Sequence, residues 1–195
     1  MTFIDTISED DATGAVAEMY AADRAALGYV RNLTKALAIA PEVSAAWVQL
    51  NASIKERMDL RRYELATIAA ARRLRSTYCM HAHGSVLLDQ FLDADALAAV
   101  VNDHHAAGLD PADVAVMDFA DRIAADASSI TEDDVERLRE HGLSDADIFD
   151  VAAAASARCF FSKLLDALGV RADASYRELD PELGALLTVG RPVAS

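Results

Sequence analysis

The chain has 195 residues, of which 53% are hydrophobic and 26% charged, and its formal net charge is −14. This length and composition predict one globular domain rather than a disordered chain, and so acidic a surface disfavours nucleic acid and anionic membranes as partners. The first residues lack a basic segment followed by an apolar one, and the sequence has no run of about 18 apolar residues, so we expect neither a signal peptide nor a membrane span.

Apolar residues recur at helical spacing through the first half of the chain, and no stretch reads convincingly as a strand. Gly28 stops the first predicted helix, and the second ends before Pro41 because the residue that precedes a proline avoids the α region. Asp59 can cap the fourth helix. The predicted helices cover residues 12–27, 31–40, 42–57, 60–74, 76–91 and 94–105.

Capping signals mark the helices of the second half. Asp110-Pro111 places a proline at the first helical position behind an Asp cap. Thr131 and Ser144 each stand three residues before an acid, as in a capping box. The last of these opens a long helix over about 145–168, and we expect a short helix and a loose tail over 170–195. The sequence therefore predicts an all-α domain of about eight or nine helices.

The segment RSTYCMHAHG, residues 75–84, holds one of the two cysteines and two of the five histidines. If Ser76 caps a helix, Cys79 is its third residue, where free backbone N–H groups and the positive end of the helix dipole lower a thiol pKa. His83 follows four residues later on the same face and could take or give a proton. Tyr78 flanks the thiol and could hydrogen-bond to such a relay. The pattern favours a reactive thiol.

Two further points concern the polar residues in this region. Glu64 lies near the start of the preceding helix, so a kink or a crossing would be needed to bring it beside Cys79. As metal ligands, Cys79, His81 and His83 are poorly spaced, because residues two apart face different sides of a helix and no fourth ligand is evident. We therefore expect no metal and no cofactor, and we interpret His104-His105 as an exposed helix end.

The stretch from Tyr63 to Leu87 resembles the core motif of the AhpD-like alkylhydroperoxidase and carboxymuconolactone decarboxylase superfamily. That motif is a glutamate, eleven residues, a cysteine, two residues, a second cysteine, three residues and a histidine. Glu64, Cys79 and His83 fit all three spacings. With the flanking segments, which are similar to the peroxidase-related branch, the resemblance covers about residues 15–170. We expect an N-terminal arm over 1–14, an AhpD-like helical domain over 15–170 and a C-terminal tail over 171–195.

The resemblance implies a role for each motif residue. In peroxidatic members the second cysteine attacks the hydroperoxide, the first cysteine resolves it as a disulfide, and the glutamate and histidine relay protons. Cys79 is then the attacking thiol, with Glu64 and His83 as the relay. The family also implies a homo-oligomer such as a trimer or hexamer.

Two positions depart from the motif. Ser76 stands at the first cysteine and cannot form a disulfide, so an external thiol reductant or another cysteine must resolve oxidised Cys79. Cys159, the only other cysteine, lies in an apolar helix and is expected to belong to the core. Tyr78 occupies the place where some members carry a histidine of the relay.

Three functions remain open at this stage. The first is a thiol-dependent peroxidase-like oxidoreductase that reduces organic hydroperoxides through Cys79. The second is an acid–base enzyme of the lactone decarboxylase kind, in which His83 and Glu64 move protons on a small cyclic acid and no thiol turns over. The third is a non-catalytic member of the family that binds a ligand or partner. Two cysteines without a disulfide framework predict a reducing cytoplasm for all three.

Overall fold

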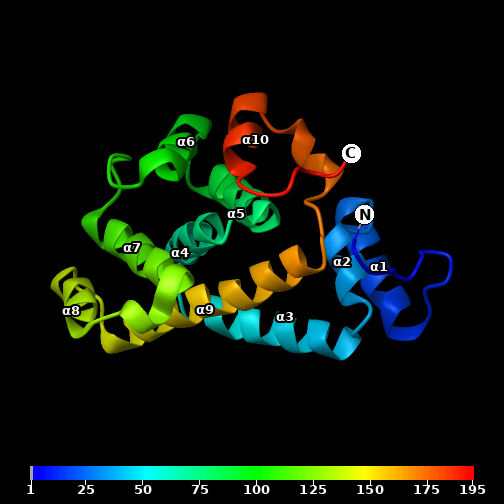
Figure 1. The fold of residues 1–195 in the computed structure, drawn as a ribbon, viewed down its shortest axis with the longest axis horizontal. Helices are drawn as coiled ribbons and strands as arrows, with labels where there is room; N and C mark the ends of the chain where they lie inside the picture. The colour runs from blue at the N-terminus through cyan, green and yellow to red at the C-terminus, as the bar shows by residue number, and fades with distance from the viewer. Residues whose placement is uncertain (1) are drawn as a thin grey trace.

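The computed structural model describes residues 2–195, which form ten α-helices, two short 3-10 helices and no β-strand (Figure 1). The all-α prediction is confirmed. The α-helices are α1 (Gly14–Leu27), α2 (Asn32–Leu37), α3 (Pro41–Lys55), α4 (Leu60–Arg73), α5 (Thr77–Gln90), α6 (Ala94–Asp103), α7 (Pro111–Asp126), α8 (Glu132–Glu140), α9 (Asp145–Ala167) and α10 (Pro181–Leu187). The 3-10 helices are Ala127–Ser129 and Ala174–Glu178.

Helix α4 forms the centre of the domain. It packs against α5, α7 and α9, which surround it, while α3 lies along α9 at the lower edge of Figure 1. Every residue from Tyr63 to Ala71 is buried. Four of these nine residues are alanines, and such small side chains let neighbouring helices approach closely on several sides. A glutamate held within this stretch is therefore surrounded by protein.

The predicted helix starts agree with the structure. Thr131 and Ser144 form capping boxes at the starts of α8 and α9, and Asp59 accepts a hydrogen bond from the backbone N–H of Arg62. Asp110 likewise caps α7 by accepting from a backbone N–H in its first turn. These bonds satisfy backbone donors that the helix itself leaves unpaired.

The C-terminal segment, expected to be a short helix and a loose tail, is packed against the domain. Leu183 and Leu187 of α10 are buried in the main core, where α10 contacts α5 and α6. A Cβ added at Gly84 of α5 would meet a methyl group of Leu187 at 3.1 Å, so the small glycine provides the seat for this leucine. Two leucines one helical turn apart thus form an apolar stripe that packs on α5. The sequence pattern of residues 170–195 did not predict this contact.

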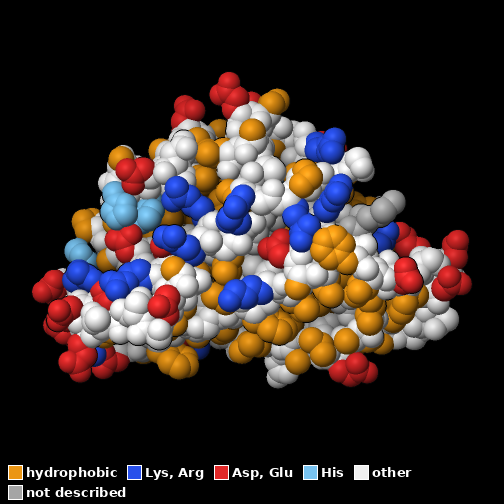
Figure 2. Space-filling view, viewed as in Figure 1, with side chains coloured by type: hydrophobic (Ala, Val, Ile, Leu, Met, Phe, Trp, Pro, Cys, Tyr) orange, Lys and Arg blue, Asp and Glu red, His pale blue; other side chains and the backbone are white. Residues whose placement is uncertain are grey.

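Helix α3 and the facing part of α9 leave an apolar surface uncovered in the single chain. Val43, Val48 and Leu50 of α3 and Phe160 of α9 are each at least 46% exposed. Figure 2 shows hydrophobic side chains gathered over this part of the molecule. Clustered exposed apolar residues commonly mark an interaction surface. The predicted homo-oligomer stays a prediction, with this surface as its candidate contact. None of the described helices combines the length and apolar character needed to cross a membrane.

Candidate active site

Cys79 lies in the first turn of α5, as the third residue of a helix that follows Ser76. Only 2% of Cys79 is exposed. Its Sγ accepts hydrogen bonds from the Ser162 hydroxyl at 3.2 Å and from the Arg158 guanidinium at 3.5 Å. Both donors belong to α9, more than 75 residues away along the chain. Two hydrogen-bond donors of α9, a helix distant in the sequence, therefore meet at the thiol.

Arg158 is a buried cation whose hydrogen-bond partners are not carboxylates. It is 3% exposed and donates to the sulfur of Cys79 and, at 3.4 Å, to the hydroxyl of Tyr63. The rings of Trp47 and Phe161 lie 5.8 and 5.7 Å from its guanidinium carbon. Burial opposes its charge, but the Cys79 and Tyr63 groups outweigh burial and raise the pKa of Arg158 above its usual value. Arg158 therefore remains protonated.

Tyr63 directs its own proton away from Arg158. Its hydroxyl donates to the side-chain oxygen of Asn51 at 2.7 Å, so its oxygen can accept from Arg158 without ionising. Cys79 is then the neighbouring group that can carry a negative charge opposite the guanidinium. Arg158 and Ser162 lie outside the sequence motif, and the only sequence signal for Arg158 is a charged residue within the apolar run ARCFF.

Glu64 and His83 meet because α4 and α5, which are consecutive helices joined by a short turn, pack against each other. His83 Nδ1 lies 2.5 Å from Glu64 Oε2, and Lys55 Nζ of α3 lies 3.2 Å from Glu64 Oε1. The glutamate side chain is 1% exposed, and that of the histidine is 15% exposed. The packing of α4 on α5 therefore joins Glu64 to His83 and Lys55, and among the described residues Glu64 has no hydrogen bond or ion pair with Cys79.

The protonation states of this pair follow from its surroundings. Burial, and then the charge of Arg158, lower the pKa of His83 to about 4, although the hydrogen bond to Glu64 acts in the opposite direction. Burial raises the pKa of Glu64, but His83 and Lys55 together lower it below its ordinary value. At neutral pH the pair is a carboxylate and a neutral imidazole, which donates Nδ1–H to Glu64 and keeps Nε2 as a proton acceptor.

Two further predicted residues lie beside this cluster without joining its hydrogen bonds. Tyr78 donates its hydroxyl to Asp173, which belongs to the segment after α9, and burial raises the pKa of Tyr78. Ser76 is fully buried at the start of α5, and its Oγ has no partner among the described residues. Its side chain makes no capping hydrogen bond. The structure therefore brings Glu64 and His83 together and aims Tyr78 elsewhere.

His81 also lies apart from the Cys79 cluster. Its Nε2 pairs with the Thr188 hydroxyl at 3.1 Å, and its ring lies 5.2 Å from that of Tyr176. The residue is fully buried, and burial lowers its pKa to about 4. His81 thus belongs to the contact between α5 and the C-terminal segment.

Burial of neutral His81 makes the stability of the protein sensitive to acid. Between pH 6.5 and 4 the unfolded chain binds a proton at this position and the folded chain does not, so the free energy of unfolding falls by about 3 kcal/mol as the pH drops through this window. His81→Gln should lose about 2 kcal/mol less than the parent between pH 7 and 4.5 in urea unfolding. His83 is present in both proteins and cancels, and an equal loss in both would contradict the assignment.

Comparison with known proteins agrees with this architecture. Residues 41–122, which include Glu64, Cys79 and His83, match the model of the carboxymuconolactone decarboxylase family. No curated protein matches the sequence.

Solved structures share the fold at low sequence identity. A peroxidase-related protein with an alkylhydroperoxidase AhpD core, from Ralstonia eutropha JMP134, has a TM-score of 0.79 at 20% identity, with 97% of this chain and 98% of that chain covered. A peroxidase-related protein from Silicibacter sp. TM1040 has a TM-score of 0.76 at 22% identity, covering 90% and 91%. The debrominase Bmp8, as a cysteine-to-alanine variant with 2,3,4-tribromopyrrole, has a TM-score of 0.76 at 13% identity, covering 94% and 98%. The chain therefore has the AhpD-like fold.

Proposed function

We propose that this chain is a member of the AhpD/carboxymuconolactone decarboxylase superfamily, whose family model residues 41–122 match, and that it is a thiol-dependent peroxidase that reduces organic hydroperoxides through Cys79. The observation that carries the proposal is the buried guanidinium of Arg158, which lies 3.5 Å from the sulfur. A buried charge is costly unless an opposite charge balances it. Since the Tyr63 proton is directed to Asn51, the thiolate of Cys79 supplies that charge, and the thiolate is the nucleophilic form of cysteine.

The reaction then proceeds as a displacement at oxygen. The Cys79 thiolate attacks the terminal oxygen of the hydroperoxide, an S–O bond forms, and the O–O bond breaks. The sulfur loses two electrons and becomes a sulfenate, the anion of a sulfenic acid. The leaving group is an alkoxide, which takes one proton and departs as an alcohol. Since only 2% of Cys79 is exposed, side chains over the sulfur must move to admit the hydroperoxide.

His83 is the proposed source of that proton. Its neutral imidazole accepts at Nε2 the proton that the terminal oxygen of the hydroperoxide carries and gives it to the alkoxide. The Glu64 carboxylate, 2.5 Å from Nδ1, orients the ring and stabilises the imidazolium that forms between the two transfers. The proton of the hydroperoxide is thus the proton that completes the alcohol, so the oxidised sulfur is left as a sulfenate and no other acid is needed.

Regeneration of Cys79 requires a thiol from outside the motif. Ser76 cannot form a disulfide, and burial raises the pKa of Cys159, which makes that thiol a poor nucleophile at neutral pH. A thiol reductant attacks the sulfenic acid, releases water and leaves a mixed disulfide, which a second thiol reduces. A reducing cytoplasm, in which we propose that the protein acts, supplies such thiols.

The test measures oxidation of Cys79 by cumene hydroperoxide on a Cys159→Ser background, followed by intact mass as the gain of one oxygen. We expect fast oxidation at pH 7, because the Arg158 guanidinium 3.5 Å from the sulfur favours the thiolate. Cys79→Ser should abolish the reaction.

Two outcomes would contradict the proposal. One is a slow rate that rises with pH as a free thiol does. The other is turnover of a carboxymuconolactone that Cys79→Ser retains and His83→Ala loses, because this result would make the protein an acid–base enzyme in which no thiol takes part.

A further inference from the structure

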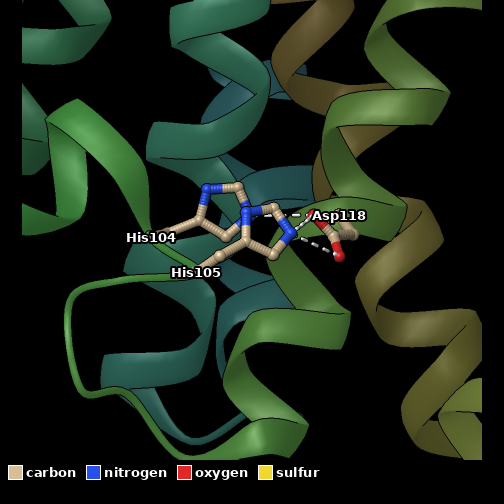
Figure 3. A group of neighbouring side chains, drawn as sticks. All are labelled: His104, His105 and Asp118. Carbon is tan, nitrogen blue, oxygen red and sulfur yellow. Dashed lines mark hydrogen bonds and ion pairs between the residues drawn. The ribbon is translucent and has the colours of Figure 1, made fainter.

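A second cluster of chemically active side chains lies where α6 ends and α7 passes beside it. His104 and His105 follow α6 directly, and Asp118 belongs to α7. Figure 3 shows both imidazoles pointing toward the Asp118 carboxylate. His104, expected to be an exposed helix end, is only 9% exposed. The cluster shares no residue with the Cys79 site.

The donor atoms of this cluster are spaced as metal ligands are. His104 Nε2 lies 2.8 Å from one carboxylate oxygen of Asp118, and His105 Nε2 lies 3.0 and 3.1 Å from its two oxygens. One ligand atom from each of the three residues lies within 4.8 Å of the others. Ligands about 2.0–2.2 Å from a central zinc ion are separated by about 3.3 Å. A metal ion therefore fits between these atoms after small side-chain rotations.

The outer contacts of His105 match those of a metal-binding histidine. Its Nδ1 lies 3.2 Å from a carboxylate oxygen of Asp103. A histidine that binds a metal through one ring nitrogen usually donates the other N–H to a carboxylate or carbonyl, which fixes the tautomer and the ring orientation. With a metal at Nε2, the Nδ1–H of His105 donates to Asp103. Without a metal, His105 must be protonated at both nitrogens to donate to Asp103 and Asp118 at once.

The cluster opens toward solvent on one side. His105 and Asp118 line a cavity of about 610 Å³, and Asp121 and His141 also belong to its wall. Figure 2 shows histidine side chains at this edge of the molecule, with acidic groups beside them. Two nitrogens and one carboxylate leave at least one coordination position free for water or a small ligand. The net charge of −14 also favours the approach of cations.

We propose that His104, His105 and Asp118 bind a divalent transition-metal ion of the zinc or cobalt class, with Asp103 as the residue that positions His105. Imidazole nitrogens select such ions over Mg²⁺ and Ca²⁺, which prefer oxygen ligands. The ion connects the end of α6 to α7 and keeps its open position toward the cavity.

The test is titration of the full chain with Co²⁺, followed by visible absorption and by calorimetry. We expect one equivalent to bind with nitrogen and oxygen ligands, and excess Mg²⁺ not to displace it. His105→Ala and Asp118→Asn should each weaken binding at least tenfold, and Asp103→Asn about tenfold. His141→Ala is the matched control, because it removes an imidazole from the same cavity and should leave the affinity unchanged.

Folding does not obscure this comparison, because the side chains of His105 and Asp118 are 57% and 47% exposed. Thermal melts in chelator will show that the variants are folded. Failure of the parent protein to bind one equivalent of Co²⁺ would overturn the proposal. An affinity of His105→Ala and Asp118→Asn equal to that of the parent protein would overturn it as well. A sulfur-to-cobalt charge-transfer band that Cys79→Ser removes would place the ion at the thiol and overturn it as well.

Discussion

Replacing Arg158 by methionine is expected to slow the reaction of Cys79 with an organic hydroperoxide about 30-fold at pH 7, because a free thiol is only about 3% ionised at that pH. The guanidinium that favours the thiolate is absent in this variant, while the aliphatic part of the side chain is kept. The rate should therefore rise with pH and approach that of the parent protein above about pH 9. Stopped-flow oxidation across this pH range measures both effects.

Arg158→Met also separates reactivity from stability. Replacement of a buried ionic group by an apolar side chain of similar size is often neutral or stabilising, so we expect the melting temperature not to fall. Ser162→Ala serves as the control, because it removes a neutral hydrogen bond to the same sulfur and should change the rate only a few-fold. An unchanged rate in Arg158→Met at pH 7 would show that the guanidinium does not activate the thiol.

The second large effect is expected at Glu64. Glu64→Gln should slow the oxidation of Cys79 by an organic hydroperoxide about 100-fold, a typical contribution of general acid–base catalysis. The new amide can donate to Nδ1 of His83, which moves the ring proton to Nε2 and removes the nitrogen that accepts the hydroperoxide proton. Alkylation by iodoacetamide expels iodide, which needs no proton, so this rate should fall far less.

Arg158→Met and Glu64→Gln are therefore expected to change the rates of oxidation by hydroperoxide and of alkylation by iodoacetamide in different ways. Arg158→Met lowers oxidation and alkylation together, since both need the thiolate, whereas Glu64→Gln lowers mainly oxidation. Lys55→Met is the control for Glu64→Gln, because it removes the other partner of the carboxylate and keeps the contact with His83. A parallel loss of both reactions in Glu64→Gln would contradict the proton-relay role.

Three of the residues in the candidate site could be predicted from the sequence because they lie in one continuous motif. Glu64, Cys79 and His83 occupy two consecutive helices, and their spacing is fixed along the chain. Arg158 and Ser162 could not be predicted in this way, since they reach the sulfur from 79 and 83 residues away. An arginine in an apolar run has no sequence signature that distinguishes a buried cation from a surface one.

The helical class and the starts of most helices follow from local sequence patterns alone. Periodicity and capping act between residues at most four apart, so Thr131 and Ser144 mark their helices whatever surrounds them. Which helices meet depends on tertiary packing. The crossing of α4 and α5 joins Glu64 to His83, and the packing of α9 brings Arg158 to Cys79. These contacts depend on how apolar faces pack together, and that information is distributed over the whole chain rather than held in any one segment.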